Sequence, residues 1–362
     1  MSQQLYFAYG SNLNQQDFDD RCSKQRIPQG LLKFHSKANL PDFDLAFSYR
    51  SKTRNGGVLD IKPRTGQLVP GVLFEVDNDG WDAMDKKEGA PRVYERVAVE
   101  VLNERGESLE AVTYAVCKSR KEAFVQPHPR YVGIVRKGLD DWNIGDAQLN
   151  AVAEDNESEC PNGFFFYGTL LRGEPRFHIL RPFGLECTIM AETFGRLWDL
   201  ESFPALVDTG SLEQLVQGDF VRLQKPEQAI HQLDQIEGFN GFGMPNSLYR
   251  RTFVGVSVGD GRVRHGWTYC LADRARTASG IVSGDWRQHL GHRETFLKKL
   301  VFAHSDGDEL ALAIRIAERS TWRDQTVEDL AKSLMPLHQA LARDEISERK
   351  MAQASGKWVV AV

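Results

Sequence analysis

The chain opens with an apolar run, Leu5-Tyr6-Phe7-Ala8, that ends at Tyr9-Gly10-Ser11-Asn12-Leu13. A short apolar run bounded by glycine and polar residues is typical of a buried strand. The polar segment Gln15–Lys24 that follows predicts a surface helix, so a turn is expected at Gly10. Glycine is favoured where the backbone takes positive φ or approaches a ligand, and successive N–H groups at such a turn can bind an anion. An ordinary strand–turn–helix is the alternative.

The next segments of the first half alternate between strand and helix patterns. A helix is predicted over residues 81–88, because Gly89 and Pro91 behind it are typical stop signals. Another helix is predicted over residues 129–139. Period-two or apolar segments predict strands over residues 43–49, 58–61, 70–76, 94–102 and 110–116.

The second half repeats the first in the same order. Phe164-Phe165-Phe166-Tyr167-Gly168-Thr169-Leu170 has the same aromatic run, Tyr-Gly pair, hydroxyl residue and leucine as the opening. Because the turn occurs twice, a shared role is favoured over a chance strand–turn–helix. The pattern also predicts a helix over residues 226–237, before Gly238, and strands over residues 193–198, 205–208, 217–223, 249–258 and 263–271.

The length of the chain indicates more than one domain. A chain of 362 residues fits two domains with a remainder. The last segment has leucines at helical spacing and no counterpart in the first half, which predicts a helical layer or an oligomer contact. The predicted organisation is a first domain over residues 1–150, an acidic linker over 151–163, a second domain over 164–300 and a C-terminal helical extension over 301–362.

Composition and charge exclude several classes of protein. The hydrophobic content of 41% is sufficient for ordinary cores, and a net charge of −5 gives no reason to expect a nucleic-acid partner. No apolar run approaches the roughly 20 residues of a membrane span, and the start lacks the features of a secretory signal. The five dispersed cysteines are typical of a cytoplasmic protein. No Walker or Rossmann pattern is present, and His289 and His292 lack further ligands, so no metal or cofactor is expected.

Two glutamates break a local rule of helix formation. Glu88 and Glu237 each lie in the last turn of a predicted helix, in the sequence Asp-x-x-Glu-Gly. A carboxylate there faces the negative end of the helix dipole, which costs about 0.3–1 kcal/mol. The dipole and any burial are expected to raise the pKa of the carboxyl toward neutrality, which suits a group that accepts and donates a proton. The alternative is a solvated surface glutamate, and the repeat favours catalysis.

These motifs, in this order, resemble the γ-glutamylcyclotransferase superfamily. Each half has Tyr-Gly-Ser/Thr, then Asp-x-x-Glu-Gly, then a tyrosine that opens a strand. The first half resembles γ-glutamylcyclotransferase itself, including Pro129-Arg130-Tyr131. The second half is more similar to the γ-glutamylamine cyclotransferase branch, with Phe203-Pro204-Ala205 and residues 283–287. The resemblance implies an α+β fold of two domains, each a small mixed β-barrel with flanking helices.

The resemblance also implies an activity of the amidine-lyase type within glutathione metabolism, and a set of site residues. Family members cyclise a γ-glutamyl group to 5-oxoproline and release the attached amino acid or amine, without a cofactor. Intramolecular attack needs positioning, a proton carrier and donors for the oxyanion. By this resemblance the catalytic residues are Glu88 and Glu237, and the substrate-binding residues are Tyr9, Gly10, Ser11, Asn12, Leu13, Tyr94, Tyr131, Tyr167, Gly168, Thr169, Leu170 and Tyr249.

Three readings stay open at this point. The chain is a cytoplasmic γ-glutamyl cyclotransferase, or it is a non-catalytic sensor or scaffold for γ-glutamyl compounds, or only one of its two domains is active. The second copy departs from the first in having Thr169 in place of Ser11 and a longer, glycine-rich loop over residues 239–247. These departures leave the substrate of each domain undetermined.

Overall fold

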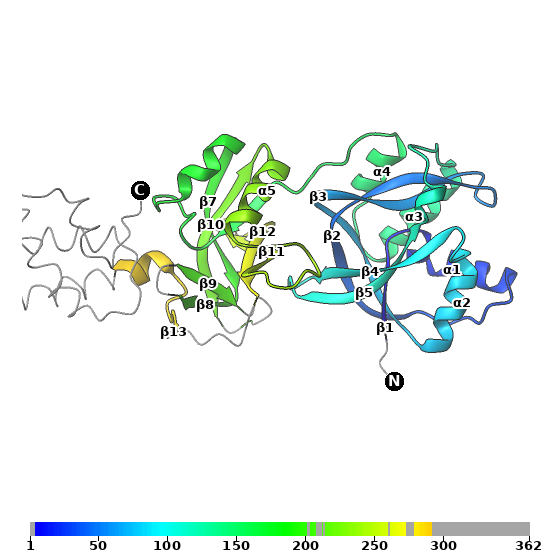
Figure 1. Cartoon of the computed structure of the whole chain (residues 1–362), viewed down its shortest axis with the longest axis horizontal. Coiled ribbons are helices and arrows are strands. Elements are labelled where there is room, and N and C mark those ends of the chain that lie inside the picture. The colour runs from blue at the N-terminus through cyan, green and yellow to red at the C-terminus, as the bar shows by residue number, and fades with distance from the viewer. Residues whose placement is uncertain are drawn as a thin grey trace, which may run out of the picture. The chain divides into compact units, whose positions relative to one another are not determined.

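The structure is a computed structural model, and it describes residues 4–200, 203–207, 212, 214–259, 261–272 and 279–291. Within these residues the strands form two closed five-stranded barrels and one three-stranded sheet (Figure 1). The chain splits into two compact units, each of which is described by itself. One comprises Met1–Phe166, His178–Thr193 and Asp219–Arg274, and the other comprises Tyr167–Phe177, Phe194–Gly218 and Ala275–Val362.

The first barrel closes in the order β1-β3-β2-β4-β5. β1 pairs antiparallel with β3, where Tyr6 lies opposite Phe74. It pairs parallel with β5, where Tyr6 lies opposite Val112. The barrel is therefore mixed, as predicted. Its strands are β1 (Gln4–Ala8), β2 (Lys33–Ser51), β3 (Gly56–Val76), β4 (Tyr94–Asn103) and β5 (Ser108–Val116).

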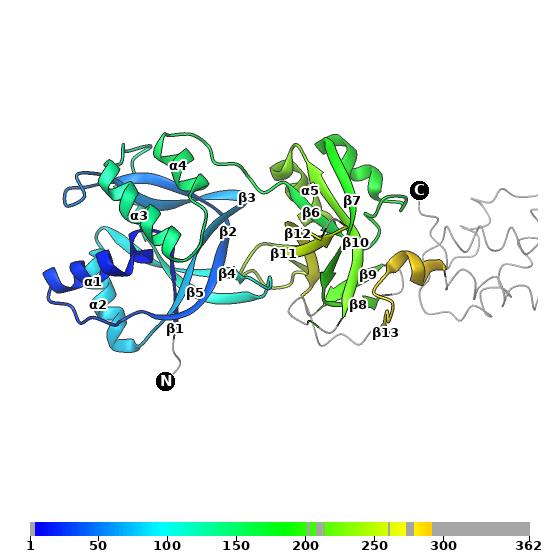
Figure 2. The same cartoon turned by 180° about the vertical axis from the view of Figure 1, so that it is seen from behind.

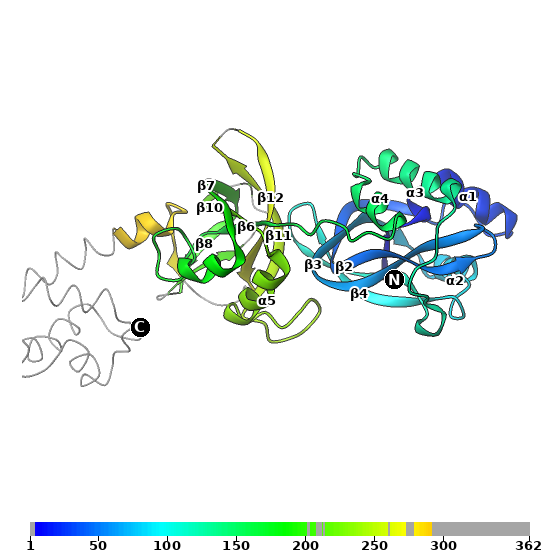
Figure 3. The same cartoon turned by 90° about the horizontal axis from the view of Figure 1, so that it is seen from above.

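Helices flank the first barrel, and α3 and α4 lie together on one side of it (Figure 3). Large buried side chains of the strands and helices, such as Phe7, Phe18 and Phe74, form one core. The helical elements are η1 (Ser11–Leu13), α1 (Gln15–Lys24), α2 (Asn78–Glu88), η2 (Lys118–Arg120), α3 (Pro129–Asp141) and α4 (Ala147–Ala153).

Strands β2 and β3 are longer than the sequence pattern predicts. The predicted strand over residues 43–49 is one part of β2, and those over 58–61 and 70–76 are the two ends of β3. The pattern breaks at prolines, but the pairing of β2 with β3 continues through a register shift between Pro41 and Phe43. A bulge lets a strand bend and continue past an irregular residue. Long bent strands of this kind allow five strands to close a barrel.

The second barrel repeats the topology of the first (Figure 2). It closes in the order β10-β6-β12-β11-β7, and Phe164 of β6 lies opposite Trp267 of the parallel strand β12. The predicted α+β fold with two small mixed barrels is therefore confirmed. The strands are β6 (Gly163–Phe166), β7 (Leu185–Phe194), β10 (Leu215–Leu223), β11 (Tyr249–Val258) and β12 (Val263–Leu271).

The remaining elements of the second half are shorter. Helix α5 (Pro226–Ile236) and the 3₁₀ segment η3 (Phe177–Phe183) accompany the barrel strands, and residues 286–291 are helical. A separate sheet has the order β13-β8-β9, formed by β8 (Arg196–Asp199), β9 (Pro204–Val207) and β13 (Ser279–Gly280). The predicted helical extension over residues 301–362 lies outside the described residues.

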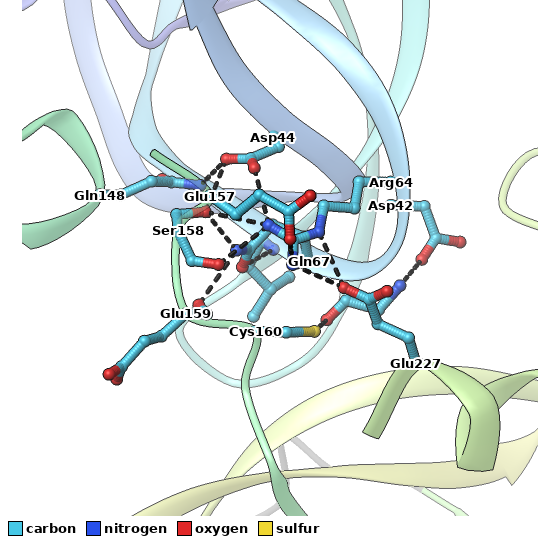
Figure 4. Close-up of polar contacts among 12 residues, drawn as sticks. Asp42, Asp44, Arg64, Gln67, Gln148, Glu157, Ser158, Glu159, Cys160 and Glu227 are labelled. Carbon is cyan, nitrogen blue, oxygen red and sulfur yellow. Dashed lines mark hydrogen bonds and ion pairs between the residues drawn. The ribbon is translucent and has the colours of Figure 1, made fainter. Parts of the chain in front are cut away.

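The segment after α4 is held by charged hydrogen bonds (Figure 4). Arg64 of β3 donates to Asp44 at 3.0 Å, to the carbonyl oxygen of Ser158 at 2.9 Å and to Glu227 at 2.8 Å. The Asp44 side chain is fully buried, and the Ser158 hydroxyl also donates to it, at 2.8 Å. Residues 151–153 of the predicted linker belong to α4, and Ser158, Glu159 and Cys160 form hydrogen bonds with β3.

Candidate active site

The turn after β1 places a row of backbone donors at one end of the first barrel. Leu13 N–H donates to the Gly10 carbonyl at 3.0 Å and Asn14 N–H to the Ser11 carbonyl at 3.2 Å, which forms the short helix η1. The N–H groups of Gly10, Ser11 and Asn12 donate to no other described residue. Gly10 has a φ of −120°, so positive φ is not the reason for this glycine.

Helix α2 carries Glu88 as its last residue. The side chain of Asp77 caps the start of the helix by accepting from Gly80 N–H at 2.7 Å, and Gly89 ends it with a left-handed φ of 67°. Trp81 and Met84 are buried and fix the inner face of the helix. The predicted stop at Gly89 is confirmed. The defined end of the helix fixes the backbone position of Glu88.

Glu88 lies in a cluster of polar side chains. Its Oε1 accepts from Asn12 Nδ2 at 2.9 Å and from Lys87 Nζ at 2.9 Å. Lys87 Nζ also donates to Asn12 Oδ1 at 2.5 Å, and Asn12 Nδ2 donates to the Tyr6 hydroxyl at 2.7 Å. Oε2 of Glu88 accepts from no described residue, and 15% of the side chain is exposed. One carboxylate oxygen is thus anchored and the other is available.

The expectation that the pKa of Glu88 is raised is wrong. Burial by itself raises the pKa of this carboxyl, but the positive charge of Lys87 and the hydrogen bonds from Asn12 and Lys87 outweigh burial, and the net pKa is below its usual value. A cation close to a carboxylate favours the ionised form. Glu88 is therefore an ionised base at neutral pH, rather than a group that titrates there.

Lys87 is the residue that sequence reasoning missed. Only 3% of its side chain is exposed, and Nζ lies 4.9 Å from the centre of the Phe18 ring. Its spacing from Trp81 and Met84, at three-residue intervals, was the available signal, because that spacing places all three on one helix face. Tyr6 was also missed, since it lies inside the apolar run and resembles any core residue of a strand.

The three predicted tyrosines of the first barrel have their hydroxyl groups anchored to backbone. Tyr9 donates to the Tyr114 carbonyl at 2.7 Å, and Tyr94 donates to the Leu59 carbonyl at 3.1 Å. Tyr131 accepts from Leu59 N–H at 3.3 Å, and its hydroxyl oxygen lies 4.0 Å from where a Cβ on Gly10 would stand. Tyr94 and Tyr131 thus hold the same residue of β3, and Tyr131 lies beside the turn.

The end of α2 is attached to the β4–β5 hairpin by a second cluster. Asp85 Oδ1 accepts from Arg96 Nε at 2.7 Å and from the Tyr114 hydroxyl at 2.7 Å. Arg96 Nη2 also donates to Asp85 Oδ2 at 2.8 Å and to the Trp81 carbonyl at 3.0 Å. Bidentate arginine–carboxylate pairs are among the strong hydrogen bonds of proteins. This contact fixes the helix three residues before Glu88.

The second barrel has a similar cluster, but its arginine makes no hydrogen bond to the aspartate. The Tyr269 hydroxyl donates to Asp234 Oδ1 at 2.7 Å, and Arg251 Nε lies 3.4 Å from the same oxygen. Asp234 precedes Glu237 by three residues, as Asp85 precedes Glu88. The aspartate of the Asp-x-x-Glu-Gly motif therefore contacts a strand tyrosine in both halves, three residues before the glutamate.

Removal of the Tyr114 hydroxyl tests this attachment. Tyr114→Phe leaves Asp85 without one hydrogen bond to a charged acceptor, so we expect a stability loss of about 1.5–3 kcal/mol. The measurement is urea unfolding followed by fluorescence. Tyr49→Phe is the matched control, because the Tyr49 hydroxyl has no partner among the described residues. Equal effects of the two substitutions would show that the hydroxyl contributes nothing to the attachment.

The site residues predicted for the second half of the chain are divided between the two compact units. Glu237, the C-cap residue of α5, and buried Tyr249 belong to the larger unit. The predicted turn Tyr167, Gly168, Thr169 and Leu170 belongs to the smaller unit. At the positions of Lys87, Asn12 and Tyr6, the repeat of the sequence has Ile236, Leu170 and Phe164.

Among the described residues, no group of three or more histidine, cysteine, aspartate and glutamate side chains could hold a metal ion. No helix formed by these residues is long and apolar enough to cross a bilayer.

Comparison with known proteins gives one family for both halves. Residues 6–132 and 164–288 match the family model described as gamma-glutamyl cyclotransferase, AIG2-like. The chain is 30% identical to gamma-glutamylcyclotransferase of Bos taurus over 182 residues, which are 48% of this chain and 91% of that protein. It is 27% identical to the Homo sapiens protein of the same name over 139 residues, 37% of this chain and 69% of that protein. A solved structure of a gamma-glutamyl cyclotransferase is similar with a TM-score of 0.37 and 25% identity, over 44% of this chain and 90% of that one.

Proposed function

Because the chain belongs to the gamma-glutamyl cyclotransferase, AIG2-like family, we propose that its first barrel converts γ-glutamyl compounds to 5-oxoproline. The observation that carries this proposal is Glu88, whose Oε1 is anchored by Asn12 and Lys87 while Oε2 accepts from no described residue. A base that is oriented through one oxygen presents the other in a defined direction. The turn at Gly10 supplies backbone donors next to the same cluster.

The proposed reaction is an intramolecular transfer. The α-amine of the substrate forms a bond to its own γ-carbonyl carbon, and the bond from that carbon to the leaving nitrogen breaks. Glu88 Oε2 takes a proton from the attacking amine and passes it to the leaving nitrogen, so no water is consumed. Both reacting groups belong to one molecule, and the site only has to hold the bent geometry.

The free N–H groups of the turn would bind negative charge. The N–H groups of Gly10, Ser11 and Asn12 are available either to the α-carboxylate of the substrate or to the oxyanion that forms at the γ-carbonyl. A Cβ on Gly10 would meet its nearest protein atoms at 3.7 Å or more, so the protein around it leaves room. Close approach of a ligand is one reason for a glycine at this position.

An ionised Glu88 suits the first step of this reaction. The substrate amine is protonated in water at neutral pH, and a carboxylate next to it favours binding of that ammonium. Lys87 keeps Glu88 ionised, and Asn12 connects both to the turn. The same oxygen then carries both protons that leave the α-nitrogen, one from the ammonium before attack and one after the new bond has formed, to the leaving nitrogen, which departs as an ammonium.

A second candidate is a chain in which only the first barrel is active. The second barrel keeps Glu237 but has Ile236, Leu170 and Phe164 where the first has Lys87, Asn12 and Tyr6. The polar side chains that anchor Glu88 in the first barrel thus have apolar counterparts in the second. The second barrel would then bind γ-glutamyl compounds without turnover.

A release assay tests the proposed function. The purified chain is incubated with γ-glutamyl dipeptides, γ-glutamyl-lysine and glutathione, and 5-oxoproline is measured by chromatography. We expect release from at least one compound, and its loss in the Glu88→Gln, Glu237→Gln double variant. Absence of product across the panel would support a sensor or scaffold. Product that persists in the double variant would show that neither glutamate is the proton carrier.

The proposed compartment is the cytoplasm. All five cysteines lie in the described part of the chain, and none forms a disulfide there. Unpaired cysteines are usual in reducing compartments.

A further inference from the structure

A largely buried arginine lies next to the proposed site and has no part in the reaction described above. Arg54 lies in the turn between β2 and β3, and only 13% of its side chain is exposed. Its Nη1 donates to Asp17 Oδ1 at 2.8 Å, and its Nη2 donates to Asp17 Oδ2. The carbon of the guanidinium lies 5.4 Å from the centre of the Tyr131 ring. The Asp17 carboxylate and the Tyr131 ring thus hold the guanidinium in place.

The guanidinium keeps donors that no described residue uses. A guanidinium has five N–H donors, and the contact with Asp17 accounts for two of them. Burial lowers the pKa of Arg54, but the hydrogen bond and charge of Asp17, with further contributions from Tyr131 and Glu88, raise it above its usual value. Arg54 is therefore a permanent cation with three N–H groups left for a ligand.

Tyr131 relates this cation to the reacting groups. The Tyr131 hydroxyl lies beside Gly10 and Leu59, whereas Arg54 lies against the ring. A γ-glutamyl group bound at the turn and at Glu88 has its leaving amino acid on the far side of the scissile bond. That part of the substrate would extend past the Tyr131 ring toward Arg54. The fork of an arginine fits a carboxylate with two parallel hydrogen bonds.

We propose that Arg54 binds the carboxylate of the leaving amino acid, so the first barrel selects γ-glutamyl amino acids over γ-glutamyl amines. This inference rests on the proposed function of Glu88. Asp17 and the Tyr131 ring hold the guanidinium in place, which reduces the entropy lost when the ligand binds. The competing explanation is that the Arg54–Asp17 pair only attaches the β2–β3 turn to α1.

Two matched substrates test the proposal. γ-Glutamyl-alanine and γ-glutamyl-ethylamide differ only in the carboxylate, and Glu237→Gln as background restricts turnover to the first barrel. With Arg54 intact, kcat/KM for the alanine compound should exceed that for the ethylamide by about tenfold or more, the range of a hydrogen bond to a charged group. Arg54→Gln should remove this preference, mainly through KM, and leave the ethylamide within about threefold. Arg54→Lys should restore part of it, because lysine keeps the charge but not the fork.

Lys52→Gln is the control, because Lys52 lies in the same turn, is exposed and also carries one positive charge. It should leave the preference unchanged. If both compounds slow equally in Arg54→Gln, the pair is only structural and the proposal is wrong. If the chain with Arg54 intact shows no preference for the alanine compound, the proposal is wrong whether or not the variant folds. If neither compound is turned over in the Glu237→Gln background, the proposed function of the first barrel fails, and the inference fails with it.

Discussion

Glu88→Gln is expected to lower kcat/KM of the first barrel by about 10²- to 10⁴-fold, the usual contribution of general acid–base catalysis. Glutamine can still accept from Asn12 and Lys87 through its amide oxygen, so the geometry of the cluster is largely kept. It cannot take the proton of the attacking amine. The measurement is 5-oxoproline release in a Glu237→Gln background, where the first barrel is the only one with its glutamate.

Two controls separate chemistry from folding in this experiment. Glu95→Gln changes an exposed glutamate next to Tyr94 and should leave activity within about twofold. Glu88→Gln also leaves the buried Lys87 without its counter-charge, so the unfolding midpoint of the variant must be measured. A folded Glu88→Gln chain that keeps most of its activity would contradict the role of Glu88 as the proton carrier.

Lys87→Met is expected to destabilise the chain by about 3–5 kcal/mol at pH 7, because one partner of a buried ion pair is removed. In the native chain the lowered pKa of Glu88 adds stability above the unfolded pKa, and that stability is lost as pH falls through the folded pKa. Without Lys87, burial should raise the pKa of Glu88, so that its ionisation at neutral pH opposes folding. The difference in unfolding free energy between the native chain and Lys87→Met should therefore be largest near pH 7. It should become smaller as pH falls below about 4.5.

The same substitution should change the pH dependence of catalysis. A base with a higher pKa becomes protonated at a higher pH. The acidic limb of the pH profile of kcat/KM should therefore shift to higher pH in Lys87→Met. Urea unfolding and 5-oxoproline release between pH 4 and pH 8 measure both effects. Lys86→Met is the matched control, since Lys86 is the exposed neighbour on the same helix. An unmoved acidic limb, or equal stability losses for the two lysines, would show that Lys87 does not set the charge state of Glu88.

The two helix-end aspartates show that a repeated motif need not repeat its electrostatics. Burial raises the pKa of Asp85, but Arg96 and Tyr114 outweigh burial, and the net pKa is lowered. In Asp234 burial dominates over the charge of Arg251, and the net pKa is raised. Arg96 contacts its aspartate at 2.7 Å and Arg251 contacts its own at 3.4 Å, which agrees with this difference.

Elements with strong local signals were predicted well. The structure has α1 at Gln15–Lys24 and β11 at Tyr249–Val258, as predicted, and α2 ends at the predicted Gly89 stop. Each of these depends on residues close in sequence, such as a cap or a period-two pattern. Strands β2 and β3 were predicted only in part, because their continuity depends on pairing across a bulge that no local pattern shows.

For the site, the sequence by itself determined the two repeats, the turn at Gly10 and the glutamate at the end of α2. These are properties of short segments, and a repeat makes them visible without a structure. Only the tertiary structure decided the charge state of Glu88, since Lys87 is its neighbour in sequence but Asn12 comes from a segment 76 residues away. It also brought Arg54 against Tyr131. Burial and charge act through space, so they depend on which distant segments the fold places together.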